Sequence, residues 1–320
     1  MRRGGTRSGR RSGCRWGVRI GCKDGVARRC LGYSRRVELL RALAALAEPP
    51  SAALRPIADA LELGPLPPAA IHADLFDFQL YPFASVYLNA DGMLGGEARD
   101  RIAGFWRALG ASPPAEPDHL TTLLGGLASL LDEAPAVCDD RAETATTRAW
   151  RAFFAEHIES WLPAWLSSLE RLCAADDRRA FFRCWGHLLG RTLAELEARA
   201  SVPGGLPLHL RAAPALADPR QDGADTFLQG LLAPAVSGII LLRDDLARGA
   251  RTLELGLRHG ERRFVLRALL GQRATATFAW LAQEAQRQAA SLRDRGPADR
   301  HWRKRAAATC HLLRALASAA

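Results

Sequence analysis

Three motifs organise this chain. In order they read Tyr81-Pro82-Phe83-Ala84-Ser85-Val86-Tyr87-Leu88, Glu116-Pro117-Asp118-His119-Leu120, and Phe153-Phe154-Ala155-Glu156-His157-Ile158-Glu159-Ser160-Trp161-Leu162-Pro163. None of them contains the spacing of a catalytic nucleophile, a phosphate-binding loop or a set of metal ligands. The sequence therefore gives little support to an enzyme, and we expect no catalytic residue, no metal and no cofactor.

From Val37 onward, apolar residues recur every three or four positions, as in amphipathic helices. The one β-like run, residues 239–242, is too short to build a sheet. The predicted fold class is all-α, with a single main helical bundle and an additional C-terminal helical extension. Within the bundle we expect an ordered loop over residues 82–96, a helix that Asp118 caps, and a helix end or kink at Pro163.

Charge divides the chain into segments. Residues 1–36 carry a net charge of +11, residues 37–200 carry −9 and residues 201–320 carry +8, which together give the +10 of the chain. Residues 201–225 are rich in proline, glycine, alanine and aspartate, as is typical of a linker or long loop. We therefore expect a helical domain over 37–200, a linker over 201–225 and a basic helical extension over 226–320. The acidic domain favours cationic partners.

The first 36 residues allow two interpretations. Their Gly, Ser and Arg content is typical of a basic disordered tail, or they precede a misassigned start of translation, with the true start near Val37. No apolar segment follows Arg10-Arg11, so we expect no export signal there. No run of 18 or more apolar residues occurs, so we expect no membrane insertion. Seven cysteines at long spacings favour free thiols in a reducing compartment, hence a cytoplasmic location.

In order and spacing, the three motifs resemble those of the TorD/DmsD/NarJ family of redox-enzyme maturation chaperones, which proofread twin-arginine signals. The resemblance covers about residues 65–200. It departs from the family pattern after the Asp-His-Leu motif, where Leu123-Leu124-Gly125-Gly126-Leu127 replaces a run with two acidic side chains. The C-terminal extension is a second departure from the usual length.

The resemblance implies a cytoplasmic all-α chaperone that is not an enzyme. Its client would be the catalytic subunit of an apo-molybdoenzyme, a DMSO reductase-type oxidoreductase. The chaperone would hold the client's signal peptide or N-terminus until cofactor insertion and assembly or export. It also implies a monomer or a helix-swapped dimer. An acidic bundle rich in Trp and Phe suits such a client, because carboxylates bind guanidinium groups and an apolar groove binds the middle of a signal peptide.

Six residues of the first two motifs are our predicted client-binding residues. Alternative structural roles stay open: the loop residues can pack against the bundle, and Asp118 can cap a helix. Four tryptophans at helical spacing, Trp150, Trp161, Trp165 and Trp185, are predicted to be core residues. The predicted client-binding set is Tyr81, Ser85, Tyr87, Glu116, Asp118 and His119.

The extension suggests two further hypotheses. Residues 244–271 form a basic, helix-turn-helix-like segment, so the alternative function is a nucleic-acid-binding regulator, although we expect no nucleic acid as the main partner. The +8 extension could also dock onto the −9 domain and cover the client groove. In that case, deletion of residues 226–320 would raise affinity for the client.

Overall fold

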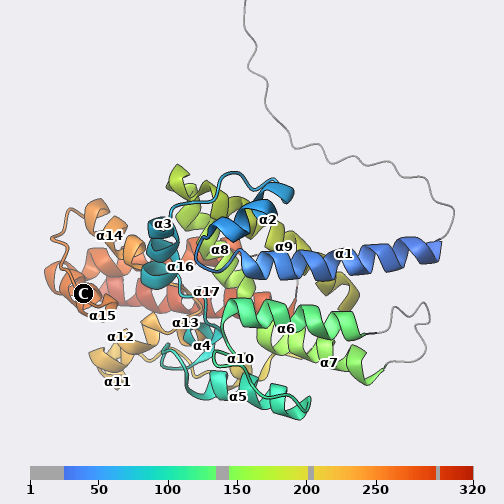
Figure 1. Ribbon diagram of the computed structural model, residues 1–320. Coiled ribbons are helices and arrows are strands. Elements are labelled where there is room, and N and C mark those ends of the chain that lie inside the picture. Colours follow the sequence, from blue (N-terminus) through green and yellow to red (C-terminus); the bar gives the residue numbers. More distant parts are fainter. Residues whose placement is uncertain (1–24, 135–143, 201–204, 293–295, 320) are drawn as a thin grey trace, which may run out of the picture.

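A computed structural model of the chain describes residues 25–134, 144–200, 205–292 and 296–319 (Figure 1). Within these residues all regular structure is helical, and the one β-type pairing is an isolated bridge between Phe83 and His119. The predicted all-α fold class is therefore confirmed.

The first part of the chain forms the bundle. Its first helix, α1, begins at Gly25, before the predicted domain start at residue 37. The bundle elements are α1 (Gly25–Ala45), η1 (Ala52–Leu54), α2 (Arg55–Ala60), α3 (Ala69–Ala73), η2 (Asp74–Gln79), α4 (Ala84–Leu88), α5 (Gly96–Ala108), α6 (Leu120–Glu133), α7 (Ala145–Phe153), η3 (Phe154–Glu159), α8 (Leu162–Ala174), η4 (Asp177–Arg179) and α9 (Ala180–Ala200).

The C-terminal part is helical as well. Two short helices lie in the predicted linker, residues 201–225, and six more helices follow. They are α10 (Leu208–Ala212), α11 (Pro219–Asp222), α12 (Ala224–Leu232), α13 (Pro234–Ser237), α14 (Arg243–Thr252), α15 (Arg262–Gln272), α16 (Ala274–Ser291) and α17 (Pro297–Ala319).

Two apolar clusters form the interior. The larger one draws on the bundle helices and contains the tryptophans predicted as core, of which Trp161, Trp165 and Trp185 are fully buried and Trp150 nearly so. The smaller cluster lies among α12 and α14–α17. Ile240, Leu242 and Trp302 come from the extension but belong to the bundle cluster. The extension is therefore packed onto the bundle.

Ion pairs reinforce this contact. We expected the acidic bundle to supply the carboxylates and the basic extension to supply the arginines, but the pairs run the other way. Arg171 of α8 donates to the buried carboxylate of Asp245 at 3.0 Å, and Arg179 donates to Asp244 at 3.3 Å. In these pairs the bundle supplies arginines and the extension supplies carboxylates. The segment net charges therefore did not predict how the two parts meet.

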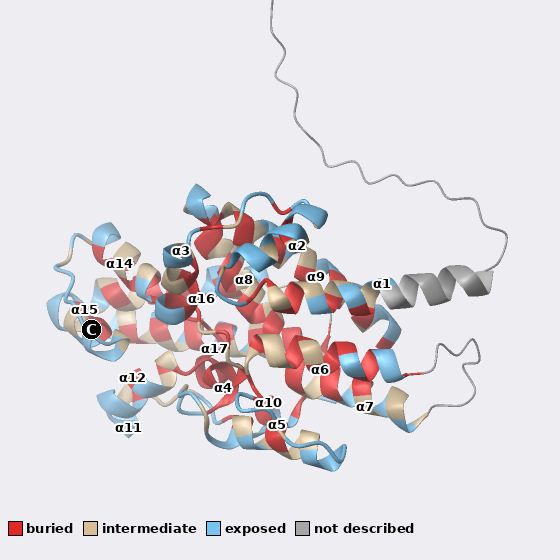
Figure 2. Ribbon diagram, in the orientation of Figure 1, coloured by how far each residue is buried: buried red, intermediate tan, exposed pale blue. Residues whose placement is uncertain are grey.

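Two local expectations were wrong. Residues 82–96 do not form a loop throughout, because residues 84–88 make the short helix α4, which is buried along its length (Figure 2). The cap of α6 is His119, whose ring accepts a hydrogen bond from the Thr121 N–H, and not Asp118. Pro163 does mark a helix boundary, since it lies in the first turn of α8.

Candidate functional site

The first two motifs pair with each other through their backbones. The Ala84 N–H donates to the Asp118 carbonyl at 2.9 Å, and the Leu120 N–H donates to the Pro82 carbonyl at 2.8 Å. The buried Asp118 carboxylate accepts a further bond from the Ser85 N–H at 3.3 Å. These contacts fix the start of α4 against the start of α6. We call residues 81–88 and 118–120 the motif brace.

The brace also holds α8 of the third motif. The Tyr81 carbonyl accepts bonds from the Tyr87 hydroxyl at 2.8 Å and from the Trp165 indole N–H at 3.1 Å. The Tyr87 ring stacks on Trp161 with centroids 5.4 Å apart. Burial raises the pKa of Tyr87, so the hydroxyl stays a hydrogen-bond donor. Because Trp161 and Trp165 belong to the start and inner face of α8, the brace sets the position of that helix.

Both π-helical turns of the bundle lie next to this contact. The turn η2 ends at Gln79, just before Tyr81, and the turn η3 ends at Glu159, just before Trp161. Single π-helical turns are frequent at functional sites, where they re-aim the following side chains. Here η2 leads into the brace at Tyr81, and η3 leads to Trp161, on which the Tyr87 ring of the brace stacks.

His119 connects the brace to the surface. Its ring meets Phe83 edge-on, with centroids 4.8 Å apart, and its Nδ1 lies 3.9 Å from a Glu48 carboxylate oxygen. Burial lowers the pKa of His119, and the carboxylates of Glu48, Glu116 and Asp118 oppose that shift. We call His119 and the exposed Glu48 and Glu116 the His119 surface.

The six predicted client-binding residues therefore fall into two groups. Ser85, Tyr87 and Asp118 are buried in the brace. Tyr81 and His119 are partly exposed, and Glu116 is exposed. Sequence patterns could not separate the groups, because the short helix that buries Ser85 and Tyr87 was not predicted.

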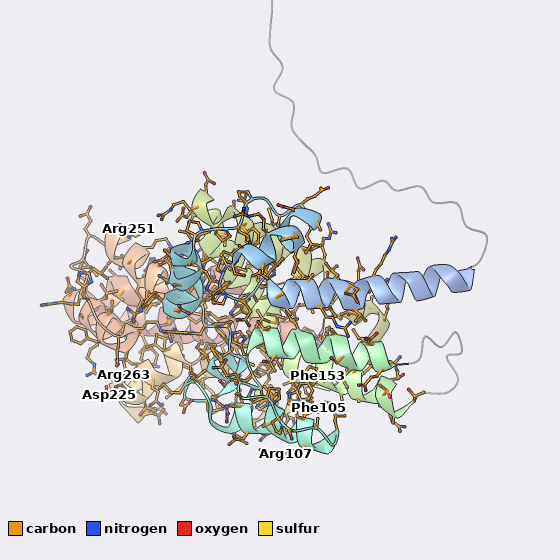
Figure 3. The ribbon with its side chains drawn as sticks, viewed as in Figure 1. Phe105, Arg107, Phe153, Asp225, Arg251 and Arg263 are labelled. Atoms are coloured by element: carbon orange, nitrogen blue, oxygen red, sulfur yellow. The ribbon has the colours of Figure 1, made fainter. Side chains whose placement is uncertain are left out.

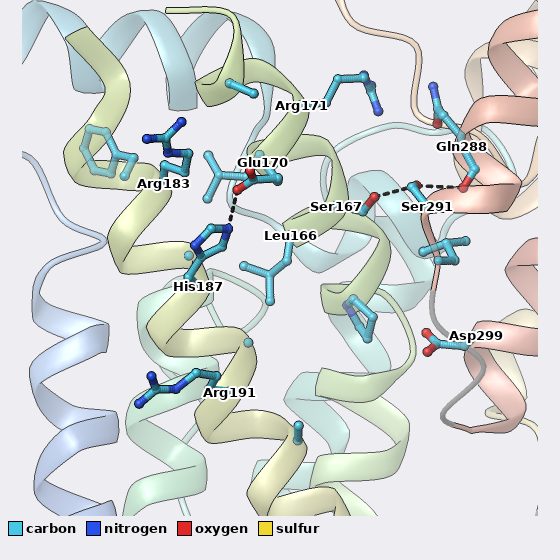
Figure 4. Close-up of a pocket in the computed structure, with 18 of the residues that line it drawn as sticks. Leu166, Ser167, Glu170, Arg171, Arg183, His187, Arg191, Gln288, Ser291 and Asp299 are labelled. Carbon is cyan, nitrogen blue, oxygen red and sulfur yellow. Dashed lines mark hydrogen bonds and ion pairs between the residues drawn. The ribbon is translucent and has the colours of Figure 1, made fainter. Parts of the chain in front are cut away.

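A groove of about 1000 Å³ runs along the outer side of α8, opposite the brace (Figure 4). We call it the α8–α9 groove. Its apolar lining includes Pro163 and Leu166 of α8 and Gly186, Gly190 and Ala194 of α9. The α9 positions are four residues apart, so small residues face the groove on successive turns. None of the six predicted client-binding residues lines it.

The rim of the groove is polar and carries both signs of charge. The Glu170 carboxylate lies 2.6 Å from the His187 ring nitrogen, and the Ser167 and Ser291 hydroxyls are 2.7 Å apart (Figure 4). Arg287 and Gln288 of α16 form part of the opposite wall. The groove is thus built jointly by the bundle and the extension. Our sequence prediction missed it because its walls are far apart in sequence.

The groove has features that suit binding. In the described ranges, no group of three or more His, Cys, Asp and Glu side chains is placed to hold a metal ion. Nor is any described helix long and apolar enough to cross a membrane. An apolar groove with a mixed polar rim can hold an amphipathic segment of another chain.

The helix-turn-helix-like segment uses several of its arginines internally. Arg248 donates to Asp245 and Glu284, Arg262 donates to the Leu241 carbonyl, and Arg267 pairs with Asp225. These arginines stabilise the extension, which reduces the cationic surface that a nucleic acid could bind.

Comparison with known proteins supports the resemblance seen in the motifs. Residues 43–167, which contain all three motifs, match the sequence model of the nitrate reductase delta subunit family. The chaperone protein TorD of Vibrio vulnificus (strain YJ016) is 32% identical over 89 residues, which make up 26% of this chain and 40% of that protein. The chain thus spans well under two thirds of this relative's length. Over residues 43–167, this chain is therefore similar to the nitrate reductase delta subunit family and, over 89 residues, to a TorD chaperone.

Proposed function

We propose that this chain is a cytoplasmic chaperone for an apo-molybdoenzyme of the DMSO reductase type. It binds the client's signal peptide or N-terminus and holds it until the cofactor is inserted and the enzyme is assembled or exported. The observation that carries the proposal is the α8–α9 groove, an apolar channel of about 1000 Å³ with a polar rim. The similarity to the nitrate reductase delta subunit family and to a TorD chaperone supports the chaperone role.

The groove suits the apolar middle of a signal peptide. Helical peptides commonly bind by laying an apolar face into a groove between helices. Gly190 deepens the groove, because it puts no side chain into it. A bound segment would meet Leu166 at the floor and polar side chains at both edges, which matches an apolar segment with polar flanks.

We assign two roles to the predicted client-binding residues. Glu116 and His119 belong to the His119 surface, whose carboxylates can accept hydrogen bonds from a cationic peptide front, and the partly exposed Tyr81 is a separate proposed contact. Ser85, Tyr87 and Asp118 position α8, and through α8 they position the groove. Loss of a residue in the second group would therefore weaken client binding indirectly, because α8 and the groove would shift.

The test is calorimetric titration of the full chain with twin-arginine signal peptides from the host's molybdoenzymes. The key variant is Gly190→Phe, which places a large ring in the groove. A Cβ at this position would meet only Leu166, at 3.7 Å, so the variant should still fold. The matched control is Gly104→Phe in α5, where a Cβ would meet nothing within 4 Å.

We expect the Gly190→Phe variant to bind at least about tenfold more weakly, since a hot-spot contact is worth about 2 kcal/mol or more. The Gly104→Phe control should bind like the parent chain. Peptides whose apolar middle is interrupted by charges should not bind. If the two variants bound with equal affinity, the groove would not be the binding site. If the parent chain bound no signal peptide, the proposed function would be refuted.

A further inference from the structure

The connection between α14 and α15 exposes two large apolar side chains. Leu257 is 42% exposed and Phe264 is 54% exposed. Every residue from Leu257 to Phe264 is exposed except Arg262. We call this stretch the 257–264 loop. Burial of both side chains against a partner would be favourable, and neither is covered within the described part of the chain.

The loop is braced at both ends. The Gln272 side chain accepts a hydrogen bond from the Gly256 N–H and donates one to the Gly256 carbonyl, each at 2.8 Å. At the other end, Arg262 turns inward and donates to the Leu241 carbonyl at 2.7 Å. The apolar side chains are therefore presented by a fixed loop, which lowers the entropy lost when they bind.

Cationic side chains flank the apolar ones. Among the described residues, Arg251, Arg258 and Arg263 are exposed and form no ion pair, in contrast to Arg171 of α8 and Arg248 of α14. Figure 3 shows Arg251 and Arg263 at the end of the molecule opposite to α1. Among the exposed residues of 251–263, the three arginines outnumber the two glutamates, Glu254 and Glu261, so the surface is net cationic.

We propose that the 257–264 loop docks this protein on an anionic membrane surface. Leu257 and Phe264 enter the boundary between headgroups and acyl chains, while Arg258 and Arg263 bind lipid phosphates. Apolar side chains surrounded by arginines are the combination that peripheral membrane attachment requires. A nucleic acid fits less well, because its phosphates offer no apolar environment to Leu257 and because Arg262 and Arg267 are engaged within the protein.

The test is sedimentation of the full chain with vesicles of phosphatidylglycerol and phosphatidylethanolamine, compared with phosphatidylcholine vesicles. The double variant Leu257→Ser/Phe264→Ser removes the apolar contacts. Its matched control is Met93→Ser/Leu94→Ser, because these side chains are 63% and 61% exposed in a different loop. Raising the salt to about 0.5 M screens attraction by the basic N-terminal segment, which is common to all variants.

We expect the parent chain to sediment with the phosphatidylglycerol vesicles. The loop variant should lose at least about tenfold in partition coefficient at the higher salt, because two buried side chains contribute most of the attachment there. The Met93/Leu94 control should match the parent. Equal partition of the loop variant and the parent would overturn the proposal. The proposal would also be overturned if the parent chain did not bind vesicles but bound duplex DNA, and if the loop variant lost that DNA binding.

Discussion

Asp118 shows how a residue of a short motif can have a structural role. Its side chain is 1% exposed, and its carboxylate accepts the Ser85 N–H inside the motif brace. The neighbouring Glu116 is exposed, although both belong to the same short motif. At the scale of single residues, the motif thus combines one structural position with one that is open to a partner.

Replacing Asp118 by alanine should destabilise the fold by about 1–3 kcal/mol, because the Ser85 N–H would lose its buried acceptor. The change is measured by urea-induced unfolding. Glu116→Ala is the control, and it should stay within about 0.5 kcal/mol of the parent, as is usual for exposed positions. A stable Asp118→Ala variant with weakened client binding would instead place Asp118 in direct contact with the client.

Residue-level patterns predicted part of this arrangement. Helical spacing identified Trp161, Trp165 and Trp185 as core residues, since large aromatics on one helix face are usually buried. The cap of α6 was predicted one residue too early. Asp118 and His119 are both polar residues before an apolar run, and only the extended backbone of His119 (φ −69°, ψ 141°) identifies it as the cap.

At the scale of elements, α9 carries two glycines with different surroundings. A Cβ at Gly186 would lie 2.9 Å from the Leu169 Cδ2, so this glycine allows α8 and α9 to approach each other closely. A Cβ at Gly190 would meet Leu166 at 3.7 Å, an ordinary contact distance. Gly186 therefore lies at a tight contact between α8 and α9, whereas Gly190 chiefly leaves the groove open.

The two alanine variants should change stability differently. Gly190→Ala should raise the free energy of unfolding by about 0.5–1 kcal/mol, because alanine is the better helix former and causes no clash. For Gly186→Ala, displacement of Leu169 offsets that gain, so the variant should be less stable than Gly190→Ala. Thermal unfolding of both proteins checks the order. A Gly186→Ala variant as stable as Gly190→Ala would show that the two helices can separate at little cost.

At the scale of the molecule, the extension is part of the same packed body as the bundle. Besides Asp244 and Asp245, the fully buried Glu284 supports the contact, with Arg248 donating to it at 2.9 Å and Arg171 3.8 Å away. Removing residues 226–320 would leave the partly buried Arg171 without these carboxylates and would leave Arg179 with only Asp74 and Asp176. Removing one partner of a buried ion pair is destabilising. Deletion would therefore disturb the fold, and point variants are the better test of whether the extension covers a binding surface.

The sequence predicted that the extension is helical, but it did not predict how the extension packs against the bundle. The local spacing predicts helices over about 226–233, 244–256, 260–271 and 274–294, and α12, α14, α15 and α16 lie close to these ranges. It did not predict α17. The docking depends on individual pairs such as Arg171 with Asp245, which segment net charges do not show. The same limit explains the missed groove, since α8, α9 and α16 come together only in the folded chain.

Buried histidines make the folded state sensitive to acid. Burial lowers the pKa of His157 to about 3 and those of His209 and His301 to about 4. An unfolded histidine has a pKa of about 6.5, so below that pH the unfolded chain binds protons that the folded chain does not. The free energy of unfolding should therefore be highest above pH 6.5 and should fall as the pH drops toward 4.

His157 tests this sensitivity most directly, because it is 5% exposed and its Nδ1 has no hydrogen-bond partner in the described part of the chain. Between pH 7.5 and pH 5, it should account for roughly 2 kcal/mol of lost stability. Urea unfolding at both values, with the parent chain and with His157→Leu, measures that share. The variant should lose less stability than the parent over this interval, because leucine takes up no proton. An equal loss in both proteins would mean that other groups, such as His209 and His301, cause the acid sensitivity.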